Sequence, residues 1–440
     1  MTVQNNFLES LKLIGSKPGL ERLDSKLGLE RIKFLLEKST VDYEKIPVVH
    51  IAGTNGKGSV ATFISKILGQ SEYKVGFYVS PHLIDIYERI QIKDKNIPPN
   101  EFDKILSELK YYCEEAEKLK NIGSPTFFEI LTAISIIYFA RKKVDIIVSE
   151  VGLGGRLDAT NILNGKAIAI TNISYDHQDI LGNTKEQILI EKAGIIKKDS
   201  KVSSCIDLEL APLLENICKD KNVPLYLFNR DFNTIQKKIS FEGSVFDYHS
   251  NENLFKDVKI KMIGKHQITN AACAINLAES LVSFGFKINE ESIRKGLKKS
   301  IWPGRFQLLK KDPMILVDVA HNVAGVKTLS DTFNELISDS KTLLLVGISI
   351  DKDLEGILAE LSKISKRIVL TTLPPRCASI NSLESIAKKY FSEINSFEDP
   401  LNAFDYCMSN LKSGERLLIT GSIYVAGYIL KGRNLLGNRK

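Results

Sequence analysis

The chain is predicted to be an α/β protein: a P-loop-containing, mostly parallel sheet domain, followed by a smaller, doubly wound, Rossmann-like C-terminal domain. Three observations predict this fold. Short apolar runs alternate with helix-period segments along most of the 440 residues, an order typical of parallel strands covered by helices on both faces. A glycine-rich turn, GTNGKGS (53–59), follows the first strand. The alternation stops over residues 231–262 and restarts after KKSIWPGRF (298–306).

The first elements follow from local periodicity. IPVVHIAG (46–53) is an apolar run that ends in glycine, which is typical of a buried strand. Apolar residues then recur at helical spacing over 57–69, and Gly69 ends that helix. The same criteria predict strands over 74–80, 144–152 and 167–174, and helices over 126–141 and about 184–197.

The middle of the chain differs in character. Residues 231–262 are polar, and their short alternating stretches suggest hairpins before a helix over about 267–284. The only tryptophan lies in the Trp-Pro-Gly turn that follows, where we place the domain boundary. Strands are then predicted over 314–320, 341–349, 366–373 and 416–422. The predicted domains are therefore 1–300 and 301–440.

Composition excludes several classes of protein. The chain is 43% hydrophobic and 26% charged, which excludes a wholly disordered chain and a small disulfide scaffold. Its net charge of +7 is scattered, which disfavours nucleic acid and is compatible with an anionic small substrate. The six cysteines form no C-x-x-C pair and are expected to be reduced core residues.

Two segments bear on where the protein is located. Residues 1–15 lack a basic start followed by an apolar run, so they do not resemble a secretory signal. The most apolar stretch, 127–140, contains Glu129 and is too short to span a bilayer. We therefore expect a cytoplasmic protein without a membrane partner, and a monomer.

GTNGKGS is the segment that most clearly indicates chemistry. It lies between a buried strand and a helix, where backbone N–H groups and a helix N-terminus face an anion. Lys57 would add a positive charge beside the β- and γ-phosphates of a nucleotide. The match to G-x-x-x-x-G-K-[ST] is imperfect, because Ile51 replaces the first glycine and Gly58 follows the lysine. The alternative is a glycine-rich turn with a surface lysine, and nucleotide binding is favoured.

The position of Gly58 affects the metal prediction. In ordinary P-loops a hydroxyl after the lysine holds Mg²⁺, so here Ser59, or Ser80 at the end of the next strand, would have to serve. Glu150 and His177 also follow apolar strands, and parallel sheets place ligands at the carboxyl ends of their strands. These side chains could therefore converge to hold Mg²⁺, although histidine is an unusual ligand for it.

Each of these residues also has a structural interpretation. Ser80 could simply end a strand, Glu150 could be neutralised by Arg156, and His177 could be a capping or core histidine. In the C-terminal domain, DVAHN (318–322) ends a strand and begins a helix, and Arg305 could reach an anion near it. There the alternative is a strand-end carboxylate followed by a helix cap.

Several motifs occur together in a family-specific order. They are AGTNGKGS, SPHL with ERI, TFFE, EVGLGGRLDATN, DH, EKAGI, GKHQITNAA, PGRFQ and DVAHN. Together they resemble folylpolyglutamate synthase and dihydrofolate synthase, a family of the Mur ligase superfamily, over roughly residues 25–425. KLGLERI (26–32) also looks familial, but no chemistry is assigned to it.

The resemblance implies an ATP-dependent ligase that joins a folate or pteroate carboxylate to L-glutamate. The implied route is an acyl phosphate, formed by transfer of the γ-phosphoryl group, with ADP and phosphate as products. ATP and two Mg²⁺ sites are the implied cofactors, and the implied partners are small molecules: dihydropteroate or reduced folates, L-glutamate and ATP. The first domain would then bind ATP and the pterin, and the second would be the glutamate-ligase domain.

The resemblance also implies individual roles. Lys57, His177 and Lys192 are the implied catalytic residues, and Lys192 would become carbamylated, which requires a desolvated amine of lowered pKa. The implied ATP contacts are Asn55, Gly56, Lys57, Gly58, Ser59, Asn270, Arg305, Asp318 and His321. The implied metal ligands are Ser80, Glu150, His177 and carbamylated Lys192. The implied pterin contacts are Thr126, Leu157, Asp158 and Ala159.

Three alternatives remain beside a bifunctional enzyme. The first is folylpolyglutamate synthase activity alone. The second is another Mur-type amide ligase acting on a nucleotide-sugar peptide, which usually carries an extra N-terminal domain for which Gly53 leaves no room. The third is a P-loop kinase or switch, which would leave the C-terminal domain unexplained.

Overall fold

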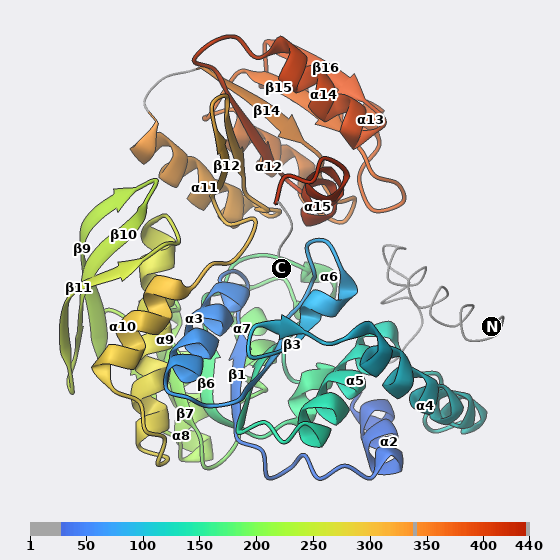
Figure 1. The fold of residues 1–440 in the computed structure, drawn as a ribbon, viewed down its shortest axis with the longest axis vertical. Helices are drawn as coiled ribbons and strands as arrows, with labels where there is room; N and C mark the ends of the chain where they lie inside the picture. The colour runs from blue at the N-terminus through green and yellow to red at the C-terminus, as the bar shows by residue number, and fades with distance from the viewer. Residues whose placement is uncertain (1–27, 338–340, 437–440) are drawn as a thin grey trace. The chain divides into compact units, whose positions relative to one another are not determined.

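The computed structural model describes residues 28–337 and 341–436. These form two compact units, each considered by itself (Figure 1). Unit 1 contains residues 28–235, 246–259 and 268–300, and unit 2 contains 236–245, 260–267 and the described residues from 301 onward. Residues 1–15, which bear on the secretory-signal argument, and the start of KLGLERI lie outside the described residues.

Unit 1 is built on an eight-stranded sheet with the order β4-β3-β2-β5-β1-β6-β7-β8. The six neighbouring strands β2, β5, β1, β6, β7 and β8 are parallel to one another. Strand β3 pairs antiparallel with β2 and with β4, at one edge of the sheet. The strands are β1 (Val48–Ala52), β2 (Val75–Tyr78), β3 (Ile90–Ile92), β4 (Lys95–Asn96), β5 (Ile146–Glu150), β6 (Gly165–Ile170), β7 (Lys201–Ser204) and β8 (Leu225–Leu227).

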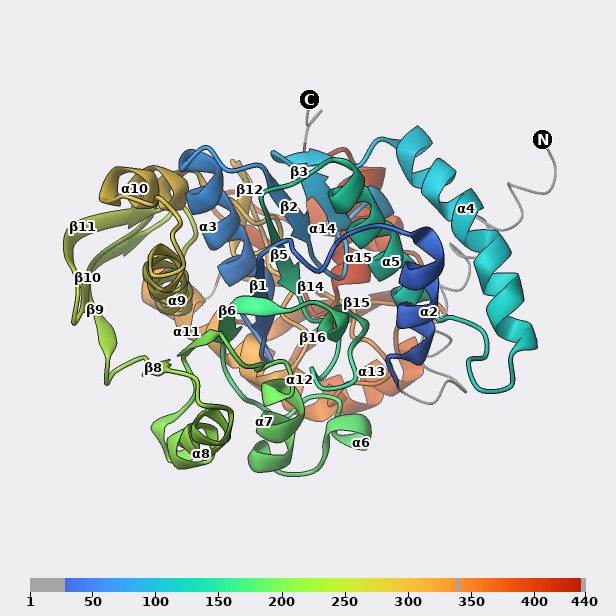
Figure 2. The same cartoon turned by 90° about the horizontal axis from the view of Figure 1, so that it is seen from below.

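Helices cover both faces of this sheet, as Figure 2 shows from below. Val48 and Ala52, which point to the same face of β1, belong to apolar clusters formed with α2, α4, α5, α7 and α8. On the other face lie α3, α9 and α10. The bounds are α2 (Glu30–Ser39), α3 (Lys57–Gln70), α4 (Pro99–Lys118), α5 (Phe127–Arg141), α6 (Gln178–Leu181), α7 (Lys185–Ala193), α8 (Ala211–Lys221), α9 (Lys265–Val282) and α10 (Glu290–Lys299).

Short 3₁₀ turns and a second sheet complete this part of the chain. The turns are η1 (Ile86–Arg89), η2 (Ala159–Ile162) and η3 (Leu208–Leu210). The polar region, predicted to form hairpins, is a three-stranded sheet of order β11-β10-β9. Its strands are β9 (Phe232–Ser240), β10 (Gly243–Ser250) and β11 (Leu254–Ile260).

Unit 2 contains a six-stranded sheet of order β12-β13-β17-β14-β15-β16, in which only β12 is antiparallel. Its strands are β12 (Gln307–Lys311), β13 (Met314–Val317), β14 (Thr342–Val346), β15 (Arg367–Thr371), β16 (Glu393–Phe397) and β17 (Arg416–Thr420). Its helices are α11 (Val323–Leu336), α12 (Leu354–Leu361), α13 (Ile380–Ala387), α14 (Pro400–Asn410) and α15 (Ile423–Gly432). The first three pack against one apolar cluster of this unit.

The predicted fold class is confirmed: two mixed α/β units, each with a mostly parallel sheet. The units are less simple than a single cut after residue 300, because 236–245 and 260–267 group with unit 2. Ile239 and Phe241 pack on the apolar cluster of unit 2, and Phe241 stacks on Phe306 with ring centroids 6.3 Å apart. No helix in the described ranges is long and apolar enough to cross a membrane.

Candidate active site

Polar groups meet at the carboxyl edge of the unit 1 sheet. Strands β2, β5, β1 and β6 are consecutive neighbours and run parallel, so their ends lie at one edge. Ser80 follows β2 and Glu150 ends β5, and the Ser80 backbone N–H donates to Glu150 Oε2 over 3.2 Å. Arg156 forms its ion pair with Glu191 over 2.9 Å. The structure therefore brings Ser80 and Glu150 together.

The loop between β1 and α3 has a backbone that requires glycine at two positions. Gly53 has φ 145°, and a Cβ there would lie 1.8 Å from Thr171 Oγ1. Gly56, the N-cap of α3, has φ 85°, and no side chain caps the helix. A Cβ at Gly56 would lie 2.5 Å from Oδ1 of Asn270, so that predicted nucleotide contact packs directly against the loop. An uncapped helix start with a close backbone can accept an anion.

The chain that leaves β6 holds this loop in place. Asn172 accepts the Thr54 N–H through its carbonyl and the Asn55 N–H through Oδ1, each over 2.9 Å. Thr54 Oγ1 donates to the Ser174 carbonyl and accepts the Ser174 N–H, over 3.1 and 3.0 Å. Thr171 Oγ1 donates to the Asn55 carbonyl over 2.6 Å. The loop conformation is therefore held by hydrogen bonds to the chain that leaves the neighbouring strand.

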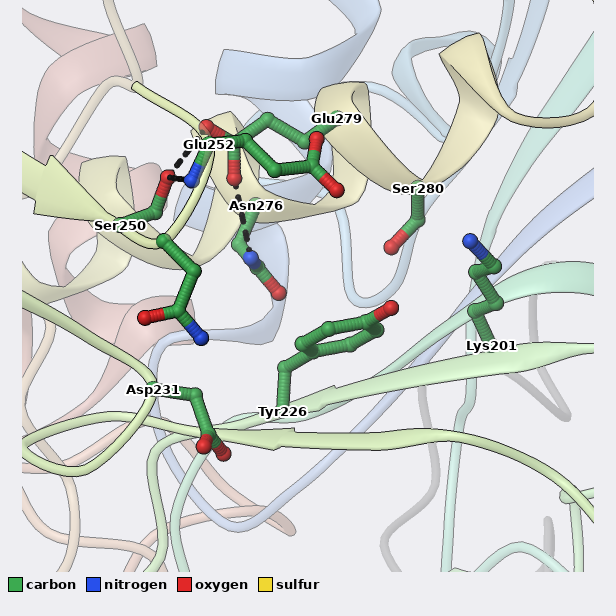
Figure 3. Close-up of a pocket in the computed structure, with 9 residues that line it drawn as sticks. Lys201, Tyr226, Asp231, Ser250, Glu252, Asn276, Glu279 and Ser280 are labelled. Atoms are coloured by element: carbon green, nitrogen blue, oxygen red, sulfur yellow. Dashed lines mark hydrogen bonds between the residues drawn. The ribbon is translucent and has the colours of Figure 1, made fainter. Parts of the chain in front are cut away.

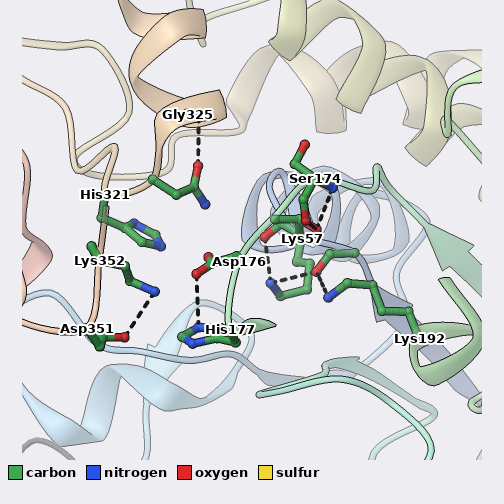
Figure 4. Close-up of polar contacts among 12 residues, drawn as sticks. Lys57, Ser174, Asp176, His177, Lys192, His321, Gly325, Asp351 and Lys352 are labelled. Atoms are coloured by element: carbon green, nitrogen blue, oxygen red, sulfur yellow. Dashed lines mark hydrogen bonds and ion pairs between the residues drawn. The ribbon is translucent and has the colours of Figure 1, made fainter. Parts of the chain in front are cut away.

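Two lysines share one carbonyl of the loop (Figure 4). Lys57 Nζ donates to the carbonyls of Gly53 and Thr54, each over 3.1 Å, and Lys192 Nζ donates to the same Gly53 oxygen over 2.9 Å. Lys192 is 5% exposed. Burial, and then the charge of Lys57, lower the pKa of Lys192 to about 7, although Asp176 and Asp158 oppose the shift. A large share of this amine is therefore neutral near pH 7, which is the condition that carbamylation requires.

His177 follows β6 and is the N-cap of α6, with φ 52°. Its Nε2 lies 3.6 Å from Oδ1 of Asp176, whose side chain is 10% exposed. The sequence analysis missed Asp176, although its position in SYDH, just beyond an apolar strand, could have identified it. This carboxylate acts on Lys192 electrostatically and stands beside the predicted metal ligand.

The donor set can be tested against Mg²⁺. Within 28–337 and 341–436, no group of three or more His, Cys, Asp and Glu side chains could hold a metal ion. Mg²⁺ usually retains several waters and takes only one or two carboxylates from the protein. Glu150, which is 5% exposed and beside Ser80 at the strand ends, supplies hard oxygen donors of that kind. The residues at this edge therefore fit the ion.

The predicted pterin contacts lie on neighbouring elements of unit 1. Thr126 is the N-cap of α5, where it forms a capping box with Glu129. Glu129 also forms a buried ion pair with Arg31 of α2 over 2.9 Å. Asp158 caps η2, and Ala159 shares an apolar cluster with Phe127, the first residue of α5. The structure thus gathers Thr126 and the half-buried Leu157 with Asp158 and Ala159 in one region.

The Asp158 carboxylate forms hydrogen bonds within the glycine-rich loop 152–158 and to Thr160. Its Oδ1 accepts the N–H and the hydroxyl of Thr160, over 3.0 and 2.5 Å, and its Oδ2 accepts the Leu153 N–H over 2.9 Å. Burial raises the pKa of Asp158, and these hydrogen bonds oppose the shift. The same loop packs closely on its surroundings, since a Cβ at Gly152 would lie 2.4 Å from Phe128.

Unit 2 carries the remaining predicted nucleotide contacts. Asp318 follows β13 and accepts the backbone N–H groups of Phe306 and Ala320, each over 2.8 Å. Burial raises the pKa of Asp318, and the positive charge of Arg305 opposes that shift, so these two groups interact. His321 Nδ1 lies 3.0 Å from the Val319 carbonyl. Their joint role with the unit 1 loop stays a prediction.

Another hollow of unit 1 lies elsewhere on the sheet (Figure 3). It encloses about 330 Å³, open solvent included, and its lining includes Lys201 at the start of β7. Its half-buried carboxylate, Glu279, already accepts from Tyr248, Asn253 and Asn276, at 2.7 to 3.1 Å. Lys201 stands at the amino end of a strand, opposite the edge that carries the glycine loop. This hollow is therefore separate from the candidate active site.

Comparison with known proteins identifies both units. The Mur ligase middle domain matches residues 51–278, and the Mur ligase glutamate ligase domain matches 304–423. The dihydrofolate synthase/folylpolyglutamate synthase of Bacillus subtilis is 33% identical over 413 residues, which cover 92% of this chain and 95% of that protein.

Solved structures give the same result. Folylpolyglutamate synthase from Thermotoga maritima is 36% identical with a TM-score of 0.84, over 99% of this chain and 98% of that one. FolC from Escherichia coli, in complex with DHPP and ADP, is 26% identical with a TM-score of 0.84, over 98% and 97%. The family expected from the motifs is confirmed, and this chain belongs to the dihydrofolate synthase/folylpolyglutamate synthase family of Mur ligases.

Proposed function

We propose that the chain is an ATP-dependent ligase that joins the carboxylate of a pteroate or folate to L-glutamate. The observation that carries the proposal is the preformed loop Gly53–Ser59, with Lys57 on it and Ser80 and Glu150 at the same sheet edge. Membership of the family supports this activity, as do the solved relative with DHPP and ADP and the glutamate ligase domain matched in unit 2.

The reaction needs activation of a carboxylate, because an oxide ion is a poor leaving group. The substrate carboxylate oxygen attacks the γ-phosphorus of ATP, and the bond to the bridging β,γ-oxygen breaks, releasing ADP. The amine of glutamate then attacks the acyl phosphate at its carbonyl carbon, and phosphate leaves as the amine gives up its proton. The phosphoryl group passes as an anion, so fixed positive charges beside it lower the barrier.

The residues of this chain divide that work. In this proposal the N–H groups of Asn55 to Ser59 bind the phosphates, and Lys57 leaves its loop carbonyls to neutralise the transferred group. Ser80, Glu150 and His177 would hold Mg²⁺, with carbamylated Lys192 at a second site. When bound, Mg²⁺ supplies charge neutralisation on the phosphate oxygens.

The remaining proposed contacts are with the adenine, with the rest of the nucleotide and with the pterin. Asn270 would contact the adenine, and Arg305, Asp318 and His321 would also contact the nucleotide. Thr126 and the segment 157–159 would bind the pterin. The expectations of a cytoplasmic monomer rest on the sequence analysis alone, and light scattering on the purified protein tests the second.

The experiment is glutamate-dependent phosphate release from MgATP, measured separately with dihydropteroate and with tetrahydrofolate. We expect release with both acceptors, since the relatives carry both names. Release with tetrahydrofolate alone would restrict the function to polyglutamate extension, the second candidate. Release with neither acceptor, from folded protein that binds ATP, would contradict the proposed function.

A further inference from the structure

A buried histidine in the central strand has no role in the mechanism above. His50 lies in β1, three residues before Gly53, and is 0% exposed. Its Nε2 lies 2.9 Å from Thr160 Oγ1, in η2. Its Nδ1 is buried without a hydrogen-bond partner among the described residues. The imidazole is therefore joined to its surroundings through one nitrogen.

The direction of the hydrogen bonds follows from the partners. A hydroxyl has one hydrogen, and that of Thr160 is donated to Asp158 Oδ1 over 2.5 Å. The carboxylate also accepts two backbone N–H groups, so both of its oxygens already serve as acceptors. Thr160 Oγ1 must then accept from His50, so the proton is on Nε2 and Nδ1 is bare. The chain of donors runs from His50 through Thr160 to Asp158.

Packing alone does not explain why a histidine occupies position 50, because its Nδ1 is buried without a hydrogen-bond partner among the described residues. A buried acceptor without a partner costs on the order of 1–3 kcal/mol. A methionine or leucine at this position would fill the space without that cost. What the imidazole adds is the Nε2–H donor, and within residues 28–337 and 341–436 the Thr160 hydroxyl is the group that receives it.

The receiving end of the chain is the glycine-rich loop. Asp158 fixes the Leu153 N–H, and so ties both ends of the loop together. Gly155 packs on the Lys192 carbonyl, where a Cβ would lie 2.7 Å away, so the loop has little room to shift. A change in the Asp158 carboxylate would therefore break a contact that this tightly packed loop cannot easily replace, and the proposed function places the loop against the pterin.

We propose that His50 is a positioning residue for the folate acceptor: its Nε2–H orients the Thr160 hydroxyl, which in turn sets the Asp158 carboxylate and the loop 152–158. This inference rests on the proposed function, which makes that loop part of the acceptor site. Because His50 is 0% exposed, it would act through Thr160 and not through direct contact with a substrate. It connects the strand that ends in the phosphate loop to the loop that receives the pterin.

The test compares donor-removing and donor-keeping variants by steady-state kinetics. His50→Met and Thr160→Val each remove the link, whereas His50→Gln offers an amide N–H in place of Nε2–H and Thr160→Ser keeps the hydroxyl. We expect the first pair to raise KM for tetrahydrofolate roughly tenfold, with KM for ATP within about twofold of the wild type. The second pair should stay near the wild type.

Coupling and tautomer supply independent readouts. The double variant His50→Met/Thr160→Val should be no worse than either single variant, because both remove the same link. In the wild type, ¹⁵N NMR should find His50 with Nε2 protonated and Nδ1 bare. If His50→Met fails to fold, Thr160→Val, Thr160→Ser and the NMR measurement still decide.

Failures of the two proposals are distinguishable. A wild type that folds and binds ATP but releases no phosphate with either acceptor contradicts the proposed function, while the NMR tautomer still tests the link. An active wild type whose donor-removing variants keep their KM for tetrahydrofolate overturns the inference. An equal rise in both KM values, in His50→Met and His50→Gln alike, would also overturn it, because it would indicate a general loss of structure.

Discussion

The two parallel sheets end differently at their carboxyl edges. In unit 1, β1 leads into a helix whose N-cap is Gly56, with no side-chain cap. In unit 2, β13 leads into α11, whose N-cap Asn322 accepts the Gly325 N–H through its side chain over 2.8 Å. The first helix start is left open to an anion, and the second is closed by the protein itself. Equivalent topology therefore gives one edge suited to phosphate and one suited to stability.

Four threonines near these two edges differ in their hydrogen bonding. In unit 1, Thr54 and Thr171 both have hydrogen-bond partners in the loop or the neighbouring strand exit. In unit 2, the hydroxyls of Thr371 and Thr420 end β15 and β17 buried and without partners among the described residues. The loop before α3 is thus held by threonine hydrogen bonds that these two strand ends of unit 2 lack, so mutations at the two edges should have different consequences.

The largest effect is expected from Lys57→Ala. Removing the cation of the open helix start should lower glutamate-dependent ATP turnover by roughly 10²- to 10³-fold or abolish it, since a fixed charge on a transferring phosphoryl group is lost. Far-UV circular dichroism should be unchanged. Lys66→Ala, on the same helix but paired with Asp94 over 2.6 Å, is the control and should keep its activity. Full activity of Lys57→Ala would refute the P-loop assignment.

Asp318→Ala tests the closed edge. Two backbone N–H groups, of Phe306 and Ala320, would lose their acceptor in a buried site. We expect a loss on the order of 2 kcal/mol in the free energy of unfolding, measured by urea titration. The exposed Asp331 of α11 gives the matched control, Asp331→Ala, which should change stability by less than about 0.5 kcal/mol. Equal losses in the two variants would contradict the role of the buried carboxylate.

Lys192 should give the open edge a pH-dependent stability. Its folded-state pKa, about 7, lies below the ordinary value of 10.5, so the folded protein releases this proton first. The penalty for burying the ammonium is complete below pH 7 and is relieved as pH rises from 7 to 10.5. Lys192→Met should therefore gain most in melting temperature over the wild type below pH 7, and the difference should narrow towards pH 10. A difference that widens with pH would contradict the assignment.

The smallest effect is expected from Asn322→Ala. Loss of the cap on α11 should cost about 1 kcal/mol, measured by chemical denaturation. Asn322→Asp keeps an oxygen acceptor and should remain near the wild-type stability. If Asn322→Ala left stability unchanged, the contrast between a closed and an open helix start would lose its energetic basis.

Much of the fold could be predicted because the spacing of apolar residues along the chain indicates which positions are buried. The helix predicted over 57–69 is Lys57–Gln70, and the strand predicted over 46–53 is Val48–Ala52. Predicted strands extended too far at their carboxyl ends: 314–320 is a strand only over Met314–Val317. Val319 and Ala320 are apolar and buried, which extended the prediction, but they lie beyond the last residue of the strand. An apolar run indicates burial but does not indicate where the backbone hydrogen bonds between neighbouring strands end.

The site was predicted in part, for a similar reason. Strand-end residues such as Ser80 and Glu150 could be found because parallel topology alone brings them together. Asp176 and Asn172 were missed, since their importance depends on contacts with Lys192 and with the loop backbone. The helix predicted over about 184–197 spans only Lys185–Ala193, and its C-cap Gly194 lies against Arg156, where a Cβ would be 2.4 Å away. Such contacts between distant segments leave no local pattern.

The carbonyl shared by Lys57 and Lys192 has a consequence for the loop during turnover. An arriving phosphate would draw Lys57 off the Gly53 oxygen, which in most loops would leave a backbone acceptor unsatisfied. Here Lys192 Nζ donates to that oxygen over 2.9 Å, and Nζ keeps one N–H after carbamylation, so the oxygen can stay bonded when Lys57 leaves. Lys57 can then exchange between its resting and working partners while the backbone keeps its shape. Because Lys192 satisfies the Gly53 carbonyl, the free-energy cost of moving Lys57 between its two sets of partners stays low.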